Sequence, residues 1–314
     1  MAEYTRLEDL DQDEICARYD LGEVMIVPVP GGAANSSFRV HEVRGKVEAD
    51  YALTVLDNDP ASAPRLASLM EKLANRHFET TELIHPSDSG LTVEIDDRVM
   101  ILKRWIEGNV YPVLPDDLLG DAGAALAGLH ALPLADVIGD EPLPAQGRRL
   151  TAEHRSRIDK FTDREFVQWL TEHLAALDNV HSGRSNTLIH GDLYSDNIIV
   201  GEQGTLHIID WETACIEDPL LDLGMAIIGL GVVDGRLVRD RAEAIIDGYS
   251  SVLPITQDER TGVLRKMVEL SALIIAYHRY HRHNVRYPGS PAANKYREMI
   301  GIVKSLDDCA LHGA

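Results

Sequence analysis

The sequence predicts an α+β fold in which a small, β-rich N-terminal region is followed by a larger, mainly helical region. Two observations support this division. Aliphatic and β-branched runs of strand length dominate the first hundred or so residues, whereas apolar residues at helical spacing dominate the chain after Gly108. A chain of 314 residues is long enough for two such regions, each with its own core. We expect the boundary near residues 105–108, with an N-terminal domain over 1–105 and a C-terminal domain over 106–314.

The N-terminal region is expected to form a sheet with one helix. Four runs have the length and composition of strands: 24–29, 37–43, 51–56 and 99–105. Between the last two, residues 64–76 place leucine and methionine side chains at helical spacing, and Pro64 lies near the start of this segment. The pattern is typical of an amphipathic helix that packs on a sheet.

The C-terminal region is expected to be helical with one hairpin. Apolar residues between 118 and 129 trace one helical face, and further helices are predicted over 151–180, 236–252, 258–286 and 292–307. Only two short aliphatic runs, 198–200 and 206–209, interrupt the helical pattern. The intervening Gly201-Glu202-Gln203-Gly204 indicates a hairpin turn.

Charge and composition exclude several classes of partner. The net charge of −21 repels phosphate backbones and anionic lipid, so neither nucleic acid nor a membrane is expected as a partner. No apolar run has the length of a membrane span and the N-terminus is not signal-like, which predicts a soluble, cytoplasmic protein. Three scattered cysteines predict neither a disulfide framework nor a structural zinc site. A monomer or a homodimer is expected.

The segment HGDLYSDN, residues 190–197, contains the strongest chemical signal. Asp192 and Asn197 lie in it, and Asp210 follows thirteen residues after Asn197, at the end of the second aliphatic run. A carboxylate and a carboxamide suit Mg²⁺, which prefers oxygen ligands, and the remaining carboxylate can accept a proton from an attacking hydroxyl. Each residue alone could be an ordinary turn residue. Together, in this order, they indicate phosphoryl transfer.

These motifs resemble those of the aminoglycoside phosphotransferase and choline kinase superfamily, which is related to protein kinases. H-G-D-x-x-x-x-N matches residues 190–197, I-D-W-E matches 209–212, and D-P-x-x-D-L matches 218–223. The resemblance implies a bilobal protein-kinase-like fold with ATP and Mg²⁺ as cofactors. It also implies that Asp192 is the catalytic base, that Asn197 and Asp210 bind Mg²⁺, and that His190 and Asp222 brace the loop. Glu212 either lines the acceptor site or is a surface residue.

The N-terminal region carries looser motifs for nucleotide binding. The segment GGAANSSF, residues 31–38, supplies Gly32 and Ser36, whose backbone can approach phosphates. The resemblance places a hinge near residues 102–106, which includes Trp105. Thr54 stands where kinases carry a phosphate-binding lysine, as in the bacterial homoserine kinase branch, which this region resembles most. Lys46, Lys103 or a second Mg²⁺ could neutralise the phosphates instead.

A basic segment of a strongly acidic chain raises a question about the acceptor. Residues 270–297 contain five Lys or Arg residues and no acid. Three of them, Arg279, Arg282 and Arg286, recur at spacings of three and four and are expected to share one helical face. These three arginines could bind a substrate carboxylate, or they could pair with acids of neighbouring helices or form a dimer contact.

The sequence therefore predicts an ATP- and Mg²⁺-dependent kinase that phosphorylates a small-molecule hydroxyl. Homoserine, or a related hydroxy amino acid or amino alcohol, is the favoured acceptor. An aminoglycoside is an alternative because the acidic surface suits a cation, and choline or ethanolamine falls between the two. A non-catalytic nucleotide-binding pseudokinase is the remaining alternative, raised by Thr54.

Overall fold

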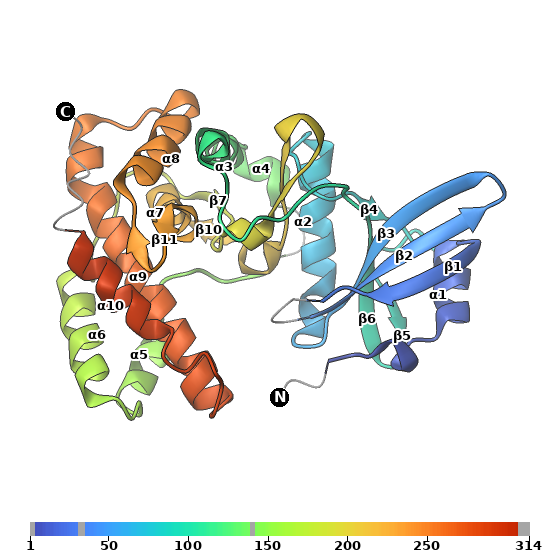
Figure 1. Cartoon of the computed structure of the whole chain (residues 1–314), viewed down its shortest axis with the longest axis horizontal. Helices are drawn as coiled ribbons and strands as arrows, with labels where there is room; N and C mark the ends of the chain where they lie inside the picture. Colours follow the sequence, from blue (N-terminus) through green and yellow to red (C-terminus); the bar gives the residue numbers. More distant parts are fainter. Residues whose placement is uncertain (1–3, 31–34, 139–141, 307–314) are drawn as a thin grey trace. The chain divides into compact units, whose positions relative to one another are not determined.

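The computed structural model describes residues 4–30, 35–138 and 142–306. The chain divides into two compact units. The N-terminal unit comprises Met1–Asn109, Ala135–Pro144 and Ile199–Glu212, and the C-terminal unit comprises Val110–Leu134, Ala145–Ile198 and Thr213–Ala314. Strands dominate the first unit and helices the second (Figure 1). The α+β fold predicted from the sequence is therefore confirmed.

The N-terminal unit is built on an antiparallel six-stranded sheet with the order β1-β2-β3-β6-β4, in which β5 also pairs with β6. Its strands are β1 (Glu23–Pro28), β2 (Ser36–Arg44), β3 (Val47–Val55), β4 (Leu83–Ile84), β5 (Val93–Ile95) and β6 (Arg98–Arg104). The four predicted strands are confirmed as β1, β2, β3 and β6. The sequence reading missed β4 and β5 because strands of two and three residues are too short to show alternation.

Two helices accompany this sheet. Helix α1 (Gln12–Tyr19) covers one face of the sheet, where Ile15 and Tyr19 pack into an apolar core with strand residues that include Leu53 and Leu102. Helix α2 (Ala63–Asn75) confirms the predicted helix and packs against β4 and β6. Helix α1 was not predicted, although Asp11 caps it by accepting a hydrogen bond from the Glu14 amide at 3.0 Å.

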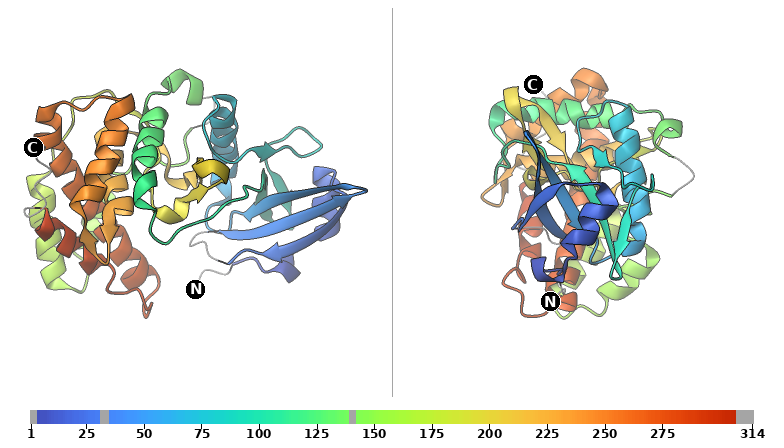
Figure 2. Two further views of the ribbon diagram at one scale, coloured as in Figure 1. Left: turned by 45° about the horizontal axis from the view of Figure 1, so that its top comes forward. Right: turned by 90° about the vertical axis from the view of Figure 1, so that its right-hand side faces the viewer.

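The C-terminal unit is a group of helices around α7, which is buried along almost all of its length (Figures 1 and 2). Its helices are α3 (Leu119–His130), α5 (Ala152–Ile158), α6 (Arg164–Ala176), α7 (Pro219–Gly231), α8 (Arg239–Val252), α9 (Arg265–Tyr280) and α10 (Tyr296–Ser305). The short α4 (Leu134–Val137) belongs to the N-terminal unit, apart from Leu134. The helix predicted over 151–180 is two helices, because Asp163 starts α6 by accepting a hydrogen bond from the Phe166 amide at 3.1 Å.

The remaining strands form short pairs. The hairpin predicted around residues 201–204 is confirmed as β8 (Ile198–Val200) and β9 (Leu206–Ile208), but residues 199–212 belong to the N-terminal unit and not to the helical region in which the hairpin was expected. The sequence reading expected no other strands after residue 108, yet β7 (Thr187–Ile189) pairs with β10 (Cys215–Glu217), and β11 (Val232–Val233) pairs with β12 (Arg236–Leu237). These strands have only two or three residues each, so they leave no periodic signal.

Of the helices within the described residues, none combines the length and the apolar composition that a bilayer span requires.

Candidate active site

The HGDLYSDN segment is the loop between β7 and β8 in the C-terminal unit, and its own polar groups shape it. The Asp192 carbonyl accepts hydrogen bonds from the Tyr194 amide at 3.0 Å and from the Asn197 side-chain nitrogen at 2.8 Å. Because the nitrogen of the Asn197 amide is used in this way, its oxygen is left as an acceptor. That oxygen accepts no hydrogen bond from another described residue.

A buried carboxylate on α7 fixes the start of the loop. Asp222 is fully buried and accepts hydrogen bonds from the His190 and Gly191 amides, both at 2.8 Å, and from His130 Nε2 at 3.0 Å. Burial would raise the pKa of Asp222, but the His130 hydrogen bond, the two histidines and the Gly191 amide together lower it. The carboxylate is therefore ionised and orients the backbone immediately before Asp192. The sequence prediction gave Asp222 this bracing role.

Two glycines let neighbouring groups approach the loop closely. Gly191 has a φ of +80°, and a Cβ atom there would come within 2.9 Å of Arg148 Cδ and 3.0 Å of the Thr213 carbonyl oxygen. On α7, a Cβ at Gly229 would lie 2.2 Å from the Leu193 carbonyl oxygen. Larger residues at either position would displace the segment that carries Asp192.

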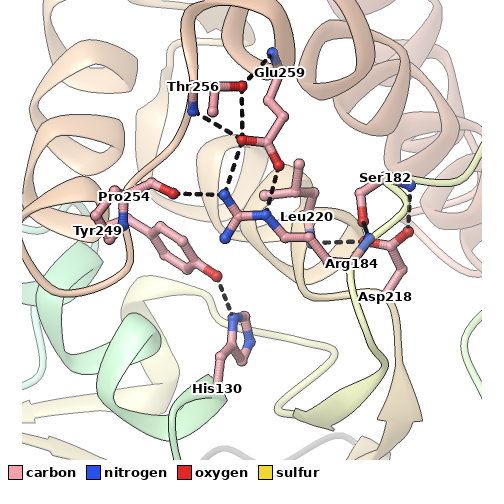
Figure 3. Close-up of polar contacts among 9 residues, drawn as sticks. All are labelled: His130, Ser182, Arg184, Asp218, Leu220, Tyr249, Pro254, Thr256 and Glu259. Carbon is pink, nitrogen blue, oxygen red and sulfur yellow. Dashed lines mark hydrogen bonds and ion pairs between the residues drawn. The ribbon is translucent and has the colours of Figure 1, made fainter.

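The N-terminal end of α7 is held by a second polar network (Figure 3). Asp218 accepts hydrogen bonds from the Leu220 amide at 3.0 Å and from the Ser182 amide at 2.7 Å. Nearby, Arg184 forms a bidentate pair with Glu259, with distances of 2.6 and 2.9 Å. The Arg184 hydrogen bonds outweigh partial burial and, with contacts from Thr256, lower the pKa of Glu259 to about 2. This network anchors the helix that supplies Asp222.

In the sheet of the N-terminal unit, Lys103 lies close to Thr54, which stands where kinases carry a phosphate-binding lysine. Lys103 on β6 is directly opposite Ala52 on β3, and Thr54 is two residues further along β3. Opposite residues of an antiparallel pair, and residues two apart on one strand, point to the same face of a sheet. Lys103 and Thr54 therefore share one face. Leu53 belongs to the other face, which α1 covers.

Charge and position distinguish Lys103 from Lys46, the two lysines that the sequence offered to neutralise the phosphates. Burial lowers the pKa of Lys103, and the negative charges of Asp210 and Glu212 oppose that effect, so both acids lie near its ammonium group. Lys46 is exposed in the turn before β3. It precedes Thr54 by eight residues, which is roughly 26 Å of extended strand. Only Lys103 lies beside Thr54.

Asp210 and Glu212 follow the hairpin strand β9 in the N-terminal unit. Asp210 is exposed and has a φ of +67°, in the left-handed region that aspartate tolerates better than most residues. Glu212 accepts a hydrogen bond from the Asn35 side chain, next to the glycine-rich segment. Trp211 between them is buried and donates from Nε1 to Thr80 at 2.9 Å. Glu212 is thus grouped with residues of the predicted nucleotide side, while its predicted role at the acceptor stays a prediction.

The remaining nucleotide-side residues vary in their surroundings. Ser36 is buried, its amide donates to Asp57 at 2.7 Å, and its hydroxyl has no hydrogen-bond partner among the described residues. Trp105 is partly buried, and the Arg39 guanidinium lies over its ring at 4.6 Å from the centroid. Gly32 lies outside the described residues.

The arginines of the basic segment do not form one α-helical face. Arg279 lies on α9, whereas Arg282 and Arg286 lie in a π-helical turn, His281–Arg286. The expected spacing of three and four fails beyond Tyr280 because a π-helix repeats over more residues than an α-helix. Arg279 pairs with Glu298 of α10 at 2.8 Å, and Arg286 lies over the Tyr287 ring. A carboxylate-binding role for these three arginines stays a prediction.

Sequence reasoning missed three residues around the catalytic loop. His130 links Asp222 to the Tyr249 hydroxyl, at 3.0 and 2.9 Å. Burial raises the pKa of Tyr194 to about 12, and Arg279, Asp192 and Arg148 are the charges around its hydroxyl. Tyr194 lies within the recognised motif, so its position was visible in the sequence. His130 and Arg148 are remote from the motif in sequence, and no spacing signal connects them to it.

Known proteins resemble this chain over most of its length. The model of the phosphotransferase enzyme family matches residues 26–255. A homoserine kinase of Neisseria meningitidis serogroup B is 24% identical over 267 residues, which cover 83% of this chain and 85% of that protein.

Solved structures show the same fold at low identity. An amicoumacin kinase in complex with AMP-PNP, Ca²⁺ and Ami superposes with a TM-score of 0.69 at 11% identity, covering 96% of this chain and 95% of that one. A microcompartment-associated aminopropanol kinase gives a TM-score of 0.64 at 17% identity, covering 95% and 98%. The kinase-like fold implied by the motifs is therefore confirmed.

Proposed function

The chain belongs to the phosphotransferase enzyme family, and we propose that it transfers the γ-phosphoryl group of ATP to the hydroxyl of homoserine or a related hydroxy amino acid. The observation that carries the proposal is the braced loop around Asp192, in which Asp222 fixes the backbone and the Asn197 amide oxygen is left as an acceptor. Homoserine is favoured as the acceptor because relatives named homoserine kinase match more than four fifths of the chain.

In the proposed reaction, Asp192 accepts the proton of the acceptor hydroxyl as its oxygen attacks the γ-phosphorus. A new oxygen–phosphorus bond forms, the bond between the β,γ-bridging oxygen and the γ-phosphorus breaks, and ADP leaves. Asp192 suits this role because its backbone is held by neighbouring hydrogen bonds and its side chain is only partly buried. A positioned base contributes roughly 10²–10⁴-fold to the rate.

We assign Asn197 and Asp210 as the Mg²⁺ ligands. The described residues contain no cluster of three or more His, Cys, Asp or Glu side chains that would hold a metal by themselves. Mg²⁺ often has only one or two protein carboxylates and takes its other ligands from phosphates and water, so a carboxamide oxygen and an exposed carboxylate fit its chemistry. When bound, Mg²⁺ neutralises phosphate charge and orients the transferred group.

For the nucleotide, we assign Lys103 the role of the cation that Thr54 cannot supply. The support is its position on the same sheet face as Thr54 and its proximity to the two acids that follow β9. Ser36 is assigned to the nucleotide as well, because its hydroxyl is buried without a hydrogen-bond partner among the described residues. Gly32 and Trp105 complete the nucleotide side of the proposal, with the lobes divided after residue 105.

For the acceptor, the proposal retains Glu212, Arg279, Arg282 and Arg286 as binding residues, in a monomer or a homodimer. The alternative acceptor class is a cationic alcohol without a carboxylate, such as choline, ethanolamine or an aminoglycoside. One observation favours it, the net charge of −21, which attracts cations.

A product screen tests the proposal. The purified chain is incubated with ATP and Mg²⁺ and with single amino acids, amino alcohols, sugars or aminoglycosides, and each mixture is scanned for a mass gain of about 80 Da, the phosphoryl mass, and for ADP release. We expect the largest kcat/KM with homoserine. Stronger turnover of any non-carboxylated acceptor would replace the amino acid assignment, and the Asp192→Asn variant serves as the background control.

A further inference from the structure

Arg148 lies against the catalytic loop of the C-terminal unit. Its aliphatic chain packs on Gly191, between His190 and the proposed base, so closely that a Cβ at Gly191 would come within 2.9 Å of its Cδ. Its positive charge acts on the Tyr194 hydroxyl, as do the charges of Asp192 and Arg279. Arg148 is therefore one of two cations beside the residues that would receive the acceptor.

Arg148 differs from comparable arginines in lacking an acidic partner. Three arginines, Arg65, Arg148 and Arg260, have a buried Nε without a hydrogen-bond partner among the described residues. Arg65 nevertheless lies 3.8 Å from Asp59, and Arg260 lies 2.9 Å from Asp247. No ion pair or hydrogen bond joins Arg148 to any other described residue. In a chain with 51 acidic and 30 basic residues, an unpaired, half-buried arginine is unexpected.

The acids whose charges act in this region, Asp192 beside Tyr194 and Asp222 and Glu217 beside Cys215, form no ion pair with Arg148, and the histidine near it adds no negative charge. Burial, and then the charges of Arg148 and of His154 and His281, lower the pKa of His278 to about 3, so its imidazole is neutral at physiological pH. His278 in turn packs against the rings of His154 and Tyr277, with centroids 5.5 and 5.2 Å apart. A partly buried guanidinium binds an anion more strongly than one in water.

We infer that Arg148 binds the carboxylate of the acceptor, a role that rests on the proposed function. The guanidinium can donate two parallel hydrogen bonds to a carboxylate, while the stem of the side chain stays packed on Gly191. A short hydroxy acid held in this way would have its hydroxyl near the loop that carries Asp192. Arg148 thereby selects acceptors with a carboxylate over amino alcohols.

Arg279 is the weaker candidate for this role. It is also near the Tyr194 hydroxyl, but it already forms a 2.8 Å ion pair with Glu298 and donates to the Lys295 carbonyl oxygen at 3.3 Å. Binding a substrate carboxylate would require Arg279 to share or break the pair with Glu298. Arg148 has no such contact to lose.

The test compares acceptors that differ in one charged group. Homoserine carries an ammonium and a carboxylate, 4-hydroxybutyrate only the carboxylate, and 3-amino-1-propanol only the ammonium. We expect Arg148→Gln to lower kcat/KM for homoserine and 4-hydroxybutyrate roughly ten- to a hundredfold. Turnover of 3-amino-1-propanol and the KM for ATP should stay unchanged. Arg236→Gln is the matched control, because Arg236 is an exposed arginine of the same unit.

The outcomes separate this inference from the proposed function. If wild type phosphorylates homoserine and Arg148→Gln does so equally well, the function stands and the role of Arg148 is overturned. An equal loss with all three acceptors overturns it too, because a carboxylate contact cannot affect 3-amino-1-propanol. If wild type phosphorylates none of the three acceptors, the proposed function fails, and calorimetric titration with homoserine then tests the carboxylate contact alone. Weaker homoserine binding by Arg148→Gln than by wild type would support that contact. No binding by wild type, or equal binding by both, would overturn it.

Discussion

The loop that carries the proposed base, Asp192, and the residues proposed to bind phosphate (the phosphate side, Asp210 and Lys103) are organised in opposite ways. In the loop, the key orienting group, Asp222, is fully buried and has three hydrogen-bond donors. On the phosphate side, Asp210 is exposed and Lys103 has no ion pair within 4.0 Å among the described residues. We infer that buried hydrogen bonds of the fold position the proposed base, whereas the charges proposed to bind phosphate lie near one another without a direct ion pair.

The largest effect is expected when a proposed Mg²⁺ ligand, Asp210, is removed. Asp210→Ala should lose several kcal/mol of charge stabilisation, which is roughly a thousandfold or more in rate, and should require far more Mg²⁺. Asn197→Ala should be milder because a neutral amide contributes less charge. Mg²⁺ titration of ADP release measures both. Half-saturation of Asp210→Ala at the wild-type Mg²⁺ concentration would disprove the metal assignment.

The second largest effect is expected for the proposed base, Asp192. Asp192→Asn should lower kcat roughly 10²–10⁴-fold, since an amide cannot accept the hydroxyl proton. Nucleotide affinity and the thermal unfolding midpoint should be kept because the Asp222 network is untouched. Asp196→Asn, an exposed acid of the same loop, is the control. Turnover near the wild-type level in Asp192→Asn would remove it as the base.

A substitution on β6 tests whether Lys103 supplies the positive charge that Thr54 cannot. Lys103→Met should raise the KM for ATP roughly ten- to a hundredfold, because it removes a charge-assisted contact, and should leave the KM of the acceptor nearly unchanged. Lys46→Met is the matched control, since Lys46 is an exposed lysine in the turn between β2 and β3. An unchanged KM for ATP in Lys103→Met would leave the phosphates to other groups.

The smallest expected effect concerns stability and its dependence on pH. Glu259→Gln should destabilise the fold by about 1–3 kcal/mol at pH 7, because the pKa of Glu259 is lowered from 4.5 to about 2 in the folded chain. A lowered pKa stabilises the fold above pH 4.5, and that contribution is lost as pH falls from 4.5 to about 2. The deficit of the variant should therefore narrow between pH 7 and pH 3 in urea unfolding. Asp258→Asn, an exposed neighbour, should show no deficit.

What the sequence predicted depended on how local each signal was. The helix at residues 64–76 and the hairpin around 201–204 were visible because a single segment carries the whole pattern. The pair β7 and β10 was missed because three-residue strands have no period, and Asp222 gained a partner in His130 from 92 residues away. Arg148 was missed for the same reason: its contact with Gly191 is made in space, across 43 residues of sequence.

His130 gives the molecule a built-in spectroscopic probe. Its two ring nitrogens are both engaged, Nε2 with the Asp222 carboxylate and Nδ1 with the Tyr249 hydroxyl. Because a carboxylate only accepts, the partners assign the proton to Nε2. A fully buried imidazole proton held in this way exchanges slowly with water, so it should give its own downfield NMR resonance. Its broadening on warming, before backbone amides begin to exchange, would mark loosening of the catalytic loop ahead of global unfolding.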